Sequence, residues 1–140
     1  MSTTPRRTLG TLLRAAYADL AEHVYGNIAA RGFPGIRRAH GGILRHIPAQ
    51  GARLSDLARS AGMTKQSMAY LAEDLTRLGH LESIPDPADG RARILRLTPS
   101  GQALLQALTA LSAEAEAAMA ARIGPARMTA LRRALERLAG

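Results

Sequence analysis

The feature that most constrains the fold is a pair of short amphipathic helical segments joined by a turn that contains glycine. Residues 54–63 favour a helix that ends at Gly62, and Thr64 supplies the hydroxyl that typically caps the N-terminus of the next helix, which ends at Gly79. The apolar face of that second helix repeats at intervals of three and four residues and comprises Met68, Leu71, Leu75 and Leu78. This pattern predicts a helix-turn-helix, although an ordinary helical hairpin within a bundle has the same pattern.

A β-hairpin is predicted directly after the second helix. Residues 81–85 are short and extended, residues 86–90 are dense in Asp, Pro and Gly, and residues 91–97 alternate between two faces. The tip and return strand of this hairpin carry Arg91, Arg93 and Arg96. A helix-turn-helix followed by a basic hairpin is the winged-helix arrangement, which favours DNA binding over a plain bundle.

Further helices are predicted on both sides of this segment. From Leu9, an apolar stripe predicts a helix of about 22 residues, and a shorter helix is expected at about 35–47. Thr98-Pro99 begins a long helix, and Gly124-Pro125 separates it from a last amphipathic helix. The long helix has a 4-3 spacing of leucines that is typical of a coiled-coil seam and that we expect to pair with a second chain; these are Leu104, Leu108 and Leu111.

The resulting expectation is a mainly α protein with a small β-hairpin wing. Residues 1–8 form a flexible basic tail, and residues 9–140 form a single domain. The chain has 19 basic and 11 acidic residues, a net charge of +8, which favours nucleic acid or an acidic surface as partner. The absence of cysteine excludes disulfides, thiolate metal sites and thiol switches. No segment has the length and apolarity of a membrane span, so we expect a cytoplasmic protein.

Two segments carry a resemblance to a known family. Residues 54–68 resemble the helix-turn-helix of MarR-family transcriptional regulators, and residues 86–101 resemble the wing and the start of the long helix. The family's Asp-x-Arg wing motif corresponds to Asp89-Gly90-Arg91, and its LTxxG motif corresponds to Leu97–Gly101. One departure is at Glu82-Ser83, where the family commonly has Glu-Arg.

The resemblance implies a winged helix at about 35–98 and dimerisation helices at about 9–31 and 99–139. It implies a homodimer that binds a pseudo-palindromic operator on double-stranded DNA, more often as a repressor, and that a small aromatic or lipophilic effector releases. Tyr17, His23, Tyr25, His40 and Met68 are the candidates for lining the effector pocket, with core packing as the alternative role of each. The alternative function is a winged-helix protein–protein interaction module without operator reading.

The residues expected to contact DNA lie on the second helix and on the wing. Gln66 suits an adenine edge, and Thr64, Lys65, Ser67 and Tyr70 suit phosphates, sugars or bases. Arg91 and Arg93 suit the minor groove, with Asp89 orienting Arg91. Arg37 and its neighbour Arg38 suit backbone phosphates. The residues expected to hold the dimer are Leu104, Leu108, Leu111, Leu131 and Leu135.

No catalytic or metal site is predicted. The four histidines are His23, His40, His46 and His80, and they lack the HxxxH and HxxE spacings of metal sites. The sequence contains no nucleophile elbow, phosphate-binding loop or paired-carboxylate motif, so we expect neither a cofactor nor an enzyme activity.

Overall fold

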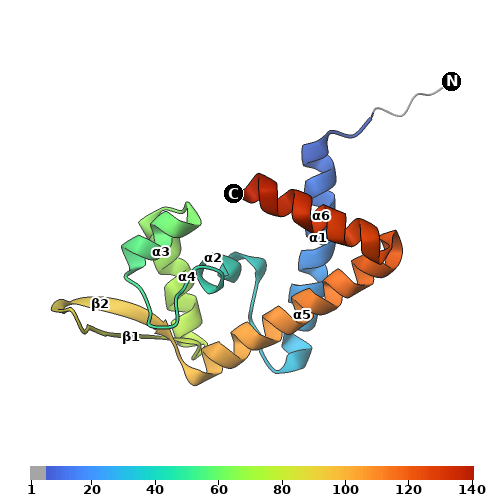
Figure 1. Cartoon of the computed structure of the whole chain (residues 1–140). Helices are drawn as coiled ribbons and strands as arrows, with labels where there is room; N and C mark the ends of the chain where they lie inside the picture. The colour runs from blue at the N-terminus through green and yellow to red at the C-terminus, as the bar shows by residue number, and fades with distance from the viewer. Residues whose placement is uncertain (1–5) are drawn as a thin grey trace. The chain divides into compact units, whose positions relative to one another are not determined.

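The computed structural model describes residues 6–140, and residues 1–5 of the predicted tail lie outside the described part. The chain forms two compact units. One unit contains residues 28–108, and the other contains the described residues up to 27 together with residues 109–140. The fold is mainly helical with one antiparallel hairpin, as the sequence predicts (Figure 1).

The unit at 28–108 contains the helix-turn-helix and the wing. It begins with two short 3₁₀ turns, η1 and η2, and it ends with the first part of α5. The predicted helix-turn-helix is present as α3 and α4, and the predicted wing as β1 and β2. The bounds are η1 Ala29–Arg31, η2 Arg38–His40, α2 Gly41–Leu44, α3 Leu54–Ala61, α4 Lys65–Arg77, β1 Leu81–Asp86, β2 Asp89–Leu97 and α5 Pro99–Ile123.

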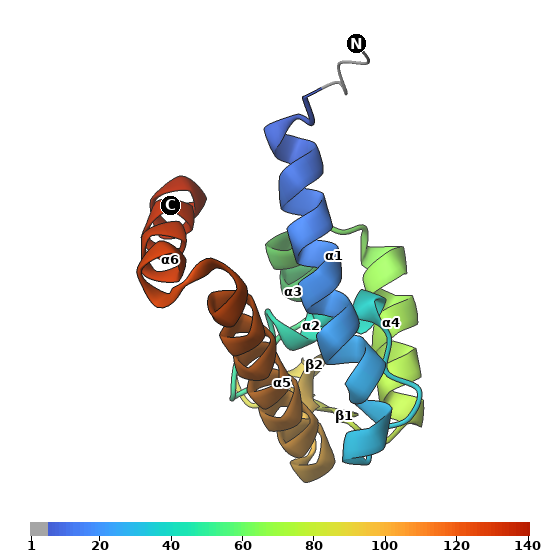
Figure 2. The same ribbon diagram turned by 90° about the vertical axis from the view of Figure 1, so that its right-hand side faces the viewer.

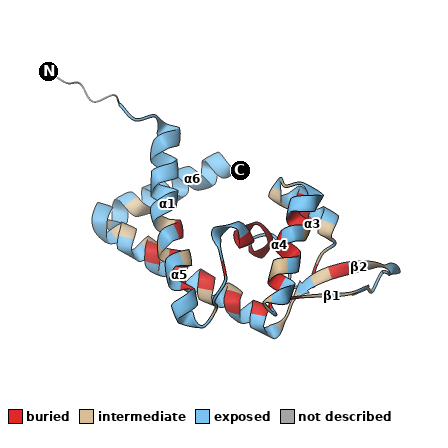
Figure 3. Cartoon of the chain, turned by 180° about the vertical axis from the view of Figure 1, so that it is seen from behind, coloured by how far each residue is buried: buried red, intermediate tan, exposed pale blue. Residues whose placement is uncertain are grey.

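The turn between α3 and α4 has the chemistry that its sequence predicts. Gly62 ends α3 with φ 65°, a left-handed conformation that glycine adopts without steric cost. Thr64 then caps α4, because its Oγ1 accepts a hydrogen bond from the backbone N–H of Ser67 at 3.1 Å. The inner face of α4 is buried through Met68, Leu71 and Leu75, which leaves the opposite face of the helix exposed (Figure 3).

The predicted second helix is much shorter than expected. Instead of one helix at about 35–47, the structure has η2 followed by the four residues of α2. Two adjacent glycines weaken the helix here, but they permit close packing. A Cβ on Gly42 would lie 2.9 Å from the sulfur of Met63, so α2 lies close to the α3–α4 turn, and a larger residue at position 42 would require the flexible Met63 side chain to shift.

The hairpin is joined to the segment before α3 by an isolated β-bridge between Ala52 and Leu95. β1 pairs with β2 from Leu81↔Leu97 to Pro85↔Arg93, and the register shifts between Pro85 and Asp86. On the other edge of β2, Ala52 and Leu95 exchange backbone hydrogen bonds of 2.9 Å in both directions. The residues before α3 therefore lie directly against the wing.

The LTxxG motif makes the sharp junction between the wing and α5. Thr98 donates its hydroxyl proton to the carbonyl of Gly79 at 2.6 Å and accepts the N–H of Gly101 at 3.1 Å. Gly101 is buried, and a Cβ there would lie only 2.0 Å from the carbonyl oxygen of His80. The motif therefore needs threonine for the cap and glycine for the close approach.

The other unit consists of α1 (Leu9–Asn27), the end of α5 and α6 (Pro125–Ala139). Its buried residues are Ala21, Val24, Leu111 and Ala115, and α6 has none. Gly124 stands between α5 and α6, and Figure 2 shows the loop that joins the two helices. The large apolar residues that remain at least one-third exposed in this unit are Leu9, Leu12, Leu13, Tyr17, Ile123, Leu131, Leu135 and Leu138.

This distribution corrects one interpretation of the sequence. Leu104, Leu108 and Leu111 were expected to form a seam awaiting a second chain, yet they are 0%, 7% and 0% exposed within a single chain. The 4-3 spacing identifies an apolar helix face but does not say which partner covers it. Of the five expected dimerisation residues, only Leu131 and Leu135 are exposed.

The close approach at Gly101 generates a prediction. Gly101→Ala should lower the free energy of unfolding by about 1–3 kcal/mol or more, because the added methyl group would overlap the His80 carbonyl. The matched control is Gly10→Ala in the first turn of α1, where a Cβ meets nothing within 4 Å; it should be neutral or stabilising by up to about 1 kcal/mol. Urea denaturation measures both, and equal stabilities of the two variants would contradict this account of the motif.

Candidate nucleic-acid interface

The exposed face of α4 begins directly after its cap. Lys65, Gln66 and Tyr70 are exposed, Tyr70 to 64%. The side chains of Lys65 and Gln66 form no hydrogen bond or ion pair with any other residue that the structure describes. The cap and the buried inner face fix the helix, so these side chains are presented on a rigid support with their polar groups available.

Thr64 and Ser67 are exposed but are already bonded to each other. The Thr64 hydroxyl donates to Ser67 Oγ at 2.9 Å while it accepts the Ser67 N–H. Both residues therefore serve first to hold the N-terminus of α4. Their remaining hydrogen-bonding capacity faces solvent, which is compatible with a phosphate contact but gives no sequence readout.

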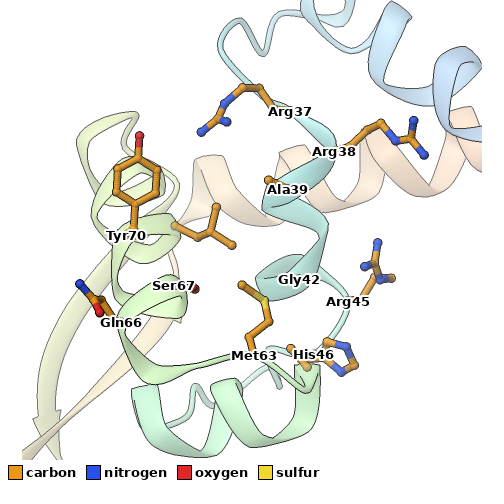
Figure 4. A pocket seen from close by; sticks show the side chains of 12 residues that line it. Arg37, Arg38, Ala39, Gly42, Arg45, His46, Met63, Gln66, Ser67 and Tyr70 are labelled. Atoms are coloured by element: carbon orange, nitrogen blue, oxygen red, sulfur yellow. The ribbon is translucent and has the colours of Figure 1, made fainter.

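A pocket of about 650 Å³ separates α4 from the η2–α2 segment (Figure 4). Met63 and Leu71 contribute apolar side chains to its lining. Ser67 points into it, whereas Gln66 points away (Figure 4). The basic residues that line it are Arg37, Arg38, Arg45 and His46. The pocket thus combines apolar side chains with basic ones beside the exposed face of α4.

A buried histidine ties α4 to the segment before α2. The His40 ring is 0% exposed; its Nδ1 accepts the backbone N–H of Arg37 at 2.8 Å, and its Nε2 lies 2.5 Å from Asp74 Oδ2. Because Nδ1 accepts, the network assigns the proton to Nε2, which donates to the carboxylate. The Arg37 guanidinium donates to the same oxygen, Asp74 Oδ2, at 3.3 Å. Arg77 pairs with the other carboxylate oxygen, Asp74 Oδ1.

This network has two consequences. The hydrogen bond from His40, followed by that from Arg37, holds the pKa of Asp74 below its usual value of 3.8. Arg37, expected to contact a phosphate, is instead paired with Asp74 in the free chain, although its side chain is 55% exposed. The sequence pattern gives no sign of this network, because its members lie 34 and 37 residues apart.

The three arginines of the wing differ in their partners. Arg93 donates to the Ser83 hydroxyl at 2.9 Å and to the Ser83 carbonyl at 2.7 Å, and Arg96 pairs across the hairpin with Glu82 at 2.5 Å. Arg91 is exposed and has no side-chain partner among residues 6–140. Ser83, where the family commonly has arginine, thus accepts hydrogen bonds from Arg93 on the opposite strand. Of the three wing arginines, Arg91 is the one whose guanidinium has no partner in the described chain.

Asp89 contacts Arg91 differently from the pairing that the resemblance implies. Its Oδ1 accepts the backbone N–H of Arg91 at 3.1 Å, and its Oδ2 lies 3.8 Å from the guanidinium of Arg53. Arg53 also donates to Asp86 Oδ2 through Nε at 3.1 Å and Nη2 at 2.9 Å. The N–H of Ala88 and then Arg53 hold the pKa of Asp86 below its usual value. Sequence reasoning missed Arg53, which lies 33 residues from its partner.

The four histidines do not form a cluster. Within the described range, no three His, Asp or Glu side chains are placed to hold a metal ion. Burial lowers the pKa of His80, whose Nδ1 is 2.9 Å from the Ser100 hydroxyl. Among the effector candidates, His40 and Met68 are fully buried in the core, whereas Tyr17 lines an apolar groove of the α1–α6 unit. None of the described helices combines the length and apolarity needed to cross a bilayer.

Residues 35–92 match the sequence model of the MarR family. The likeness to the MarR family thus extends over 58 of the 140 residues. The match covers the pocket, the helix-turn-helix and most of the wing. No structural feature of this region conflicts with the family's winged helix.

Known proteins extend the likeness to the whole chain. The transcriptional activatory protein BadR of Rhodopseudomonas palustris is 32% identical over 68 residues, which are 49% of this chain and 39% of BadR. The repressor CouR bound to a 23-mer DNA duplex superimposes with a TM-score of 0.76 at 24% identity, over 95% of this chain and 93% of CouR. BpsR of Bordetella bronchiseptica, whose DNA binding is regulated by 6-hydroxynicotinic acid, superimposes with a TM-score of 0.72 at 22% identity, over 99% of this chain and 98% of BpsR. The structural likeness at these identities shows the fold.

The charged network around His40 generates a pH prediction. Since the folded-state pKa of Asp74 lies below 3.8, its stabilising contribution is complete above that value and is lost as the pH falls through the folded-state pKa. Asp74→Asn should therefore have a lower Tm than the parent from about pH 5 to 7, and the gap should narrow below about pH 4.

The matched control is Asp56→Asn, which removes an exposed pair with Arg59 on α3 and should change Tm little at any pH. Thermal unfolding followed by circular dichroism across the pH series measures both variants. A gap for Asp74→Asn that stays constant on acidification would contradict the assignment.

Proposed function

We propose that this protein is a homodimeric, sequence-specific DNA-binding transcriptional regulator. The observation that carries the proposal is the pairing of two presented surfaces within residues 28–108. One is the exposed start of α4, with Lys65, Gln66 and Tyr70; the other is the wing, with Arg91. Both surfaces offer polar groups without partners in the described chain.

The two surfaces suit different parts of the duplex. An α-helix fits the major groove, where the amide of Gln66 can bond an adenine edge bidentately. Lys65, Thr64 and Ser67 suit phosphates, and the Tyr70 ring suits a thymine methyl or a sugar. The wing suits the minor groove, where a narrow A·T-rich segment attracts the guanidinium of Arg91. Arg37 and Arg93 would contribute to DNA binding by exchanging their present partners, Asp74 and Ser83, for phosphates.

The α1–α6 unit supports a homodimer. An apolar groove of about 640 Å³ is lined by Leu13, Tyr17, Leu131 and Leu135, among others, and α6 buries none of its own residues. A second copy would cover this surface in a two-fold symmetric interface, in which each chain offers the same patch. Two α4 helices in successive major grooves would then read a pseudo-palindromic operator.

Regulation by a small molecule is the remaining part of the proposal. CouR of Rhodococcus jostii has been solved with p-coumaroyl-CoA, and BpsR responds to 6-hydroxynicotinic acid. We infer that this chain likewise responds to a small aromatic or lipophilic effector, whose binding releases DNA and relieves repression. A wing that presents a free arginine favours DNA over the alternative, a protein–protein interaction module, which has no need of one.

The DNA-reading surfaces can be separated by mutation. Gln66→Ala should lose about 1–3 kcal/mol on the preferred duplex and little on a scrambled one, because a base contact carries sequence preference. Arg91→Ala should weaken both duplexes, and its salt slope should fall by about 0.9 for each phosphate charge no longer neutralised. Fluorescence anisotropy across a salt series, with a duplex selected from a random library, measures both; unchanged preference in the first variant and full affinity in the second would favour the protein-interaction module.

The dimer has its own test. Sedimentation at micromolar concentration should give about twice the chain mass of 14.9 kDa. Leu135→Glu should shift the protein to the monomer, because it places a charge in the apolar groove. Tyr70→Glu, which places the same charge at an exposed apolar residue of α4, should leave the mass unchanged. A parent protein that sediments as a monomer would refute the homodimer.

A further inference from the structure

Arg53 stands where the helix-turn-helix meets the wing. It is the residue that immediately precedes α3, and its carbonyl accepts the backbone N–H groups of Asp56 and Leu57, both at 3.1 Å. Its neighbour Ala52 is hydrogen-bonded to β2. The backbone of Arg53 is thus held by α3 on one side and by the sheet on the other.

The Arg53 guanidinium reaches two carboxylates of the hairpin turn. Its Nε and Nη2 both donate to Asp86, whose side chain is only 14% exposed, and Nη2 is 3.8 Å from Asp89. Asp86 lies where the β1–β2 register shifts. The ion pairs therefore act where the backbone of the wing departs from the regular ladder.

Each of these carboxylates divides its two oxygens between Arg53 and the hairpin backbone. Asp86 Oδ1 accepts the N–H of Ala88 at 2.9 Å while Oδ2 faces Arg53. Asp89 Oδ1 accepts the N–H of Arg91 at 3.1 Å while Oδ2 faces Arg53. A continuous chain of charged and hydrogen-bonded groups therefore leads from the start of α3 to the backbone of Arg91.

We propose that Arg53 is a positioning residue for DNA binding, which orders the wing tip through Asp86 and Asp89 and thereby sets the direction from which Arg91 enters the minor groove. The inference rests on the proposed DNA-binding function. Two sources of order act on the tip, the turn hydrogen bonds and Arg53. Among residues 6–140, Arg53 is the one whose side-chain contacts connect the tip to the helix-turn-helix. Without Arg53 the tip would sample more conformations in the free protein. The protein would then bind the duplex more weakly, because ordering the tip and Arg91 on binding would cost more conformational entropy.

A direct contact between Arg53 and a phosphate is the competing role, and the two roles predict different couplings. If Arg53 acts through Arg91, its effect disappears when Arg91 is absent, whereas two independent phosphate contacts are additive. Substitution of Asp86, the carboxylate partner of Arg53, also distinguishes the two roles. Asp86→Asn would weaken DNA binding if Arg53 orders the wing, but it would leave affinity unchanged or raise it if Arg53 binds phosphate, because it removes a competing anion.

The experiment is a double-mutant cycle on the full chain. Affinity for a duplex selected from a random library is measured for the parent, Arg53→Gln, Arg91→Ala and the double variant. We expect Arg53→Gln to weaken binding roughly threefold to tenfold in the parent and less than about twofold beside Arg91→Ala. Asp86→Asn should weaken binding similarly. Arg59→Gln, on the exposed face of α3, is the control and should have little effect.

A measurement without DNA accompanies the cycle. Solvent-exchange rates of the Ala88 and Arg91 amides, measured by NMR, should rise in Arg53→Gln and stay unchanged in Arg59→Gln. Equal losses of affinity in both backgrounds, no loss in either, or unchanged exchange rates would each overturn the proposal. If the parent binds no selected duplex, the proposed function fails, and the exchange rates still decide whether Arg53 orders the wing.

Discussion

The packing of the inner face of α4 is the interaction on which the rest of the unit at residues 28–108 depends. Met68 and Leu75 are fully buried and Leu71 nearly so, and burying side chains of this size contributes roughly 1.5–3 kcal/mol each. Because the helix period is 3.6 residues, fixing this face fixes the opposite one. The exposure of Gln66 and Tyr70 is therefore a consequence of the core, and the Thr64 cap sets where the presented surface begins.

Electrostatic contacts then refine what packing has placed. His40 and Arg37 hold the carboxylate of Asp74 near the C-terminal half of α4, and Arg53 holds the wing through Asp86. Most arginines of this surface are thus engaged with acids or with backbone carbonyls. Lys65 and Arg91 are among the basic residues whose side chains have no partner in the described chain, and they lie on the two surfaces suited to DNA.

Local chemistry made much of this fold predictable. The glycine stop at Gly62, the Thr64 cap and the turn residues at 86–90 each act within a few residues, and the helix end, the cap and the hairpin are each present in the structure. The shortened second helix and the burial of Leu104, Leu108 and Leu111 were not predictable in the same way. Periodicity identifies an apolar face, but what covers that face depends on segments distant in sequence.

The candidate site was predictable to the same extent. The presented residues of α4 follow from the helix period, and Arg91 follows from the wing motif, whereas the partners of Arg37, Arg93 and Asp89 required the folded chain. Arg53 and the His40–Asp74 contact join residues more than 30 positions apart, and no spacing rule connects them.

The most direct test of the central claim is an NMR titration of the full chain with a duplex selected from a random library. The account predicts that the largest amide shift changes fall on two segments, the start of α4 at residues 64–70 and the wing tip at residues 86–93. The exposed residues of α6 should change little. Saturable binding with changes confined to α6, or no change in either predicted segment, would contradict it.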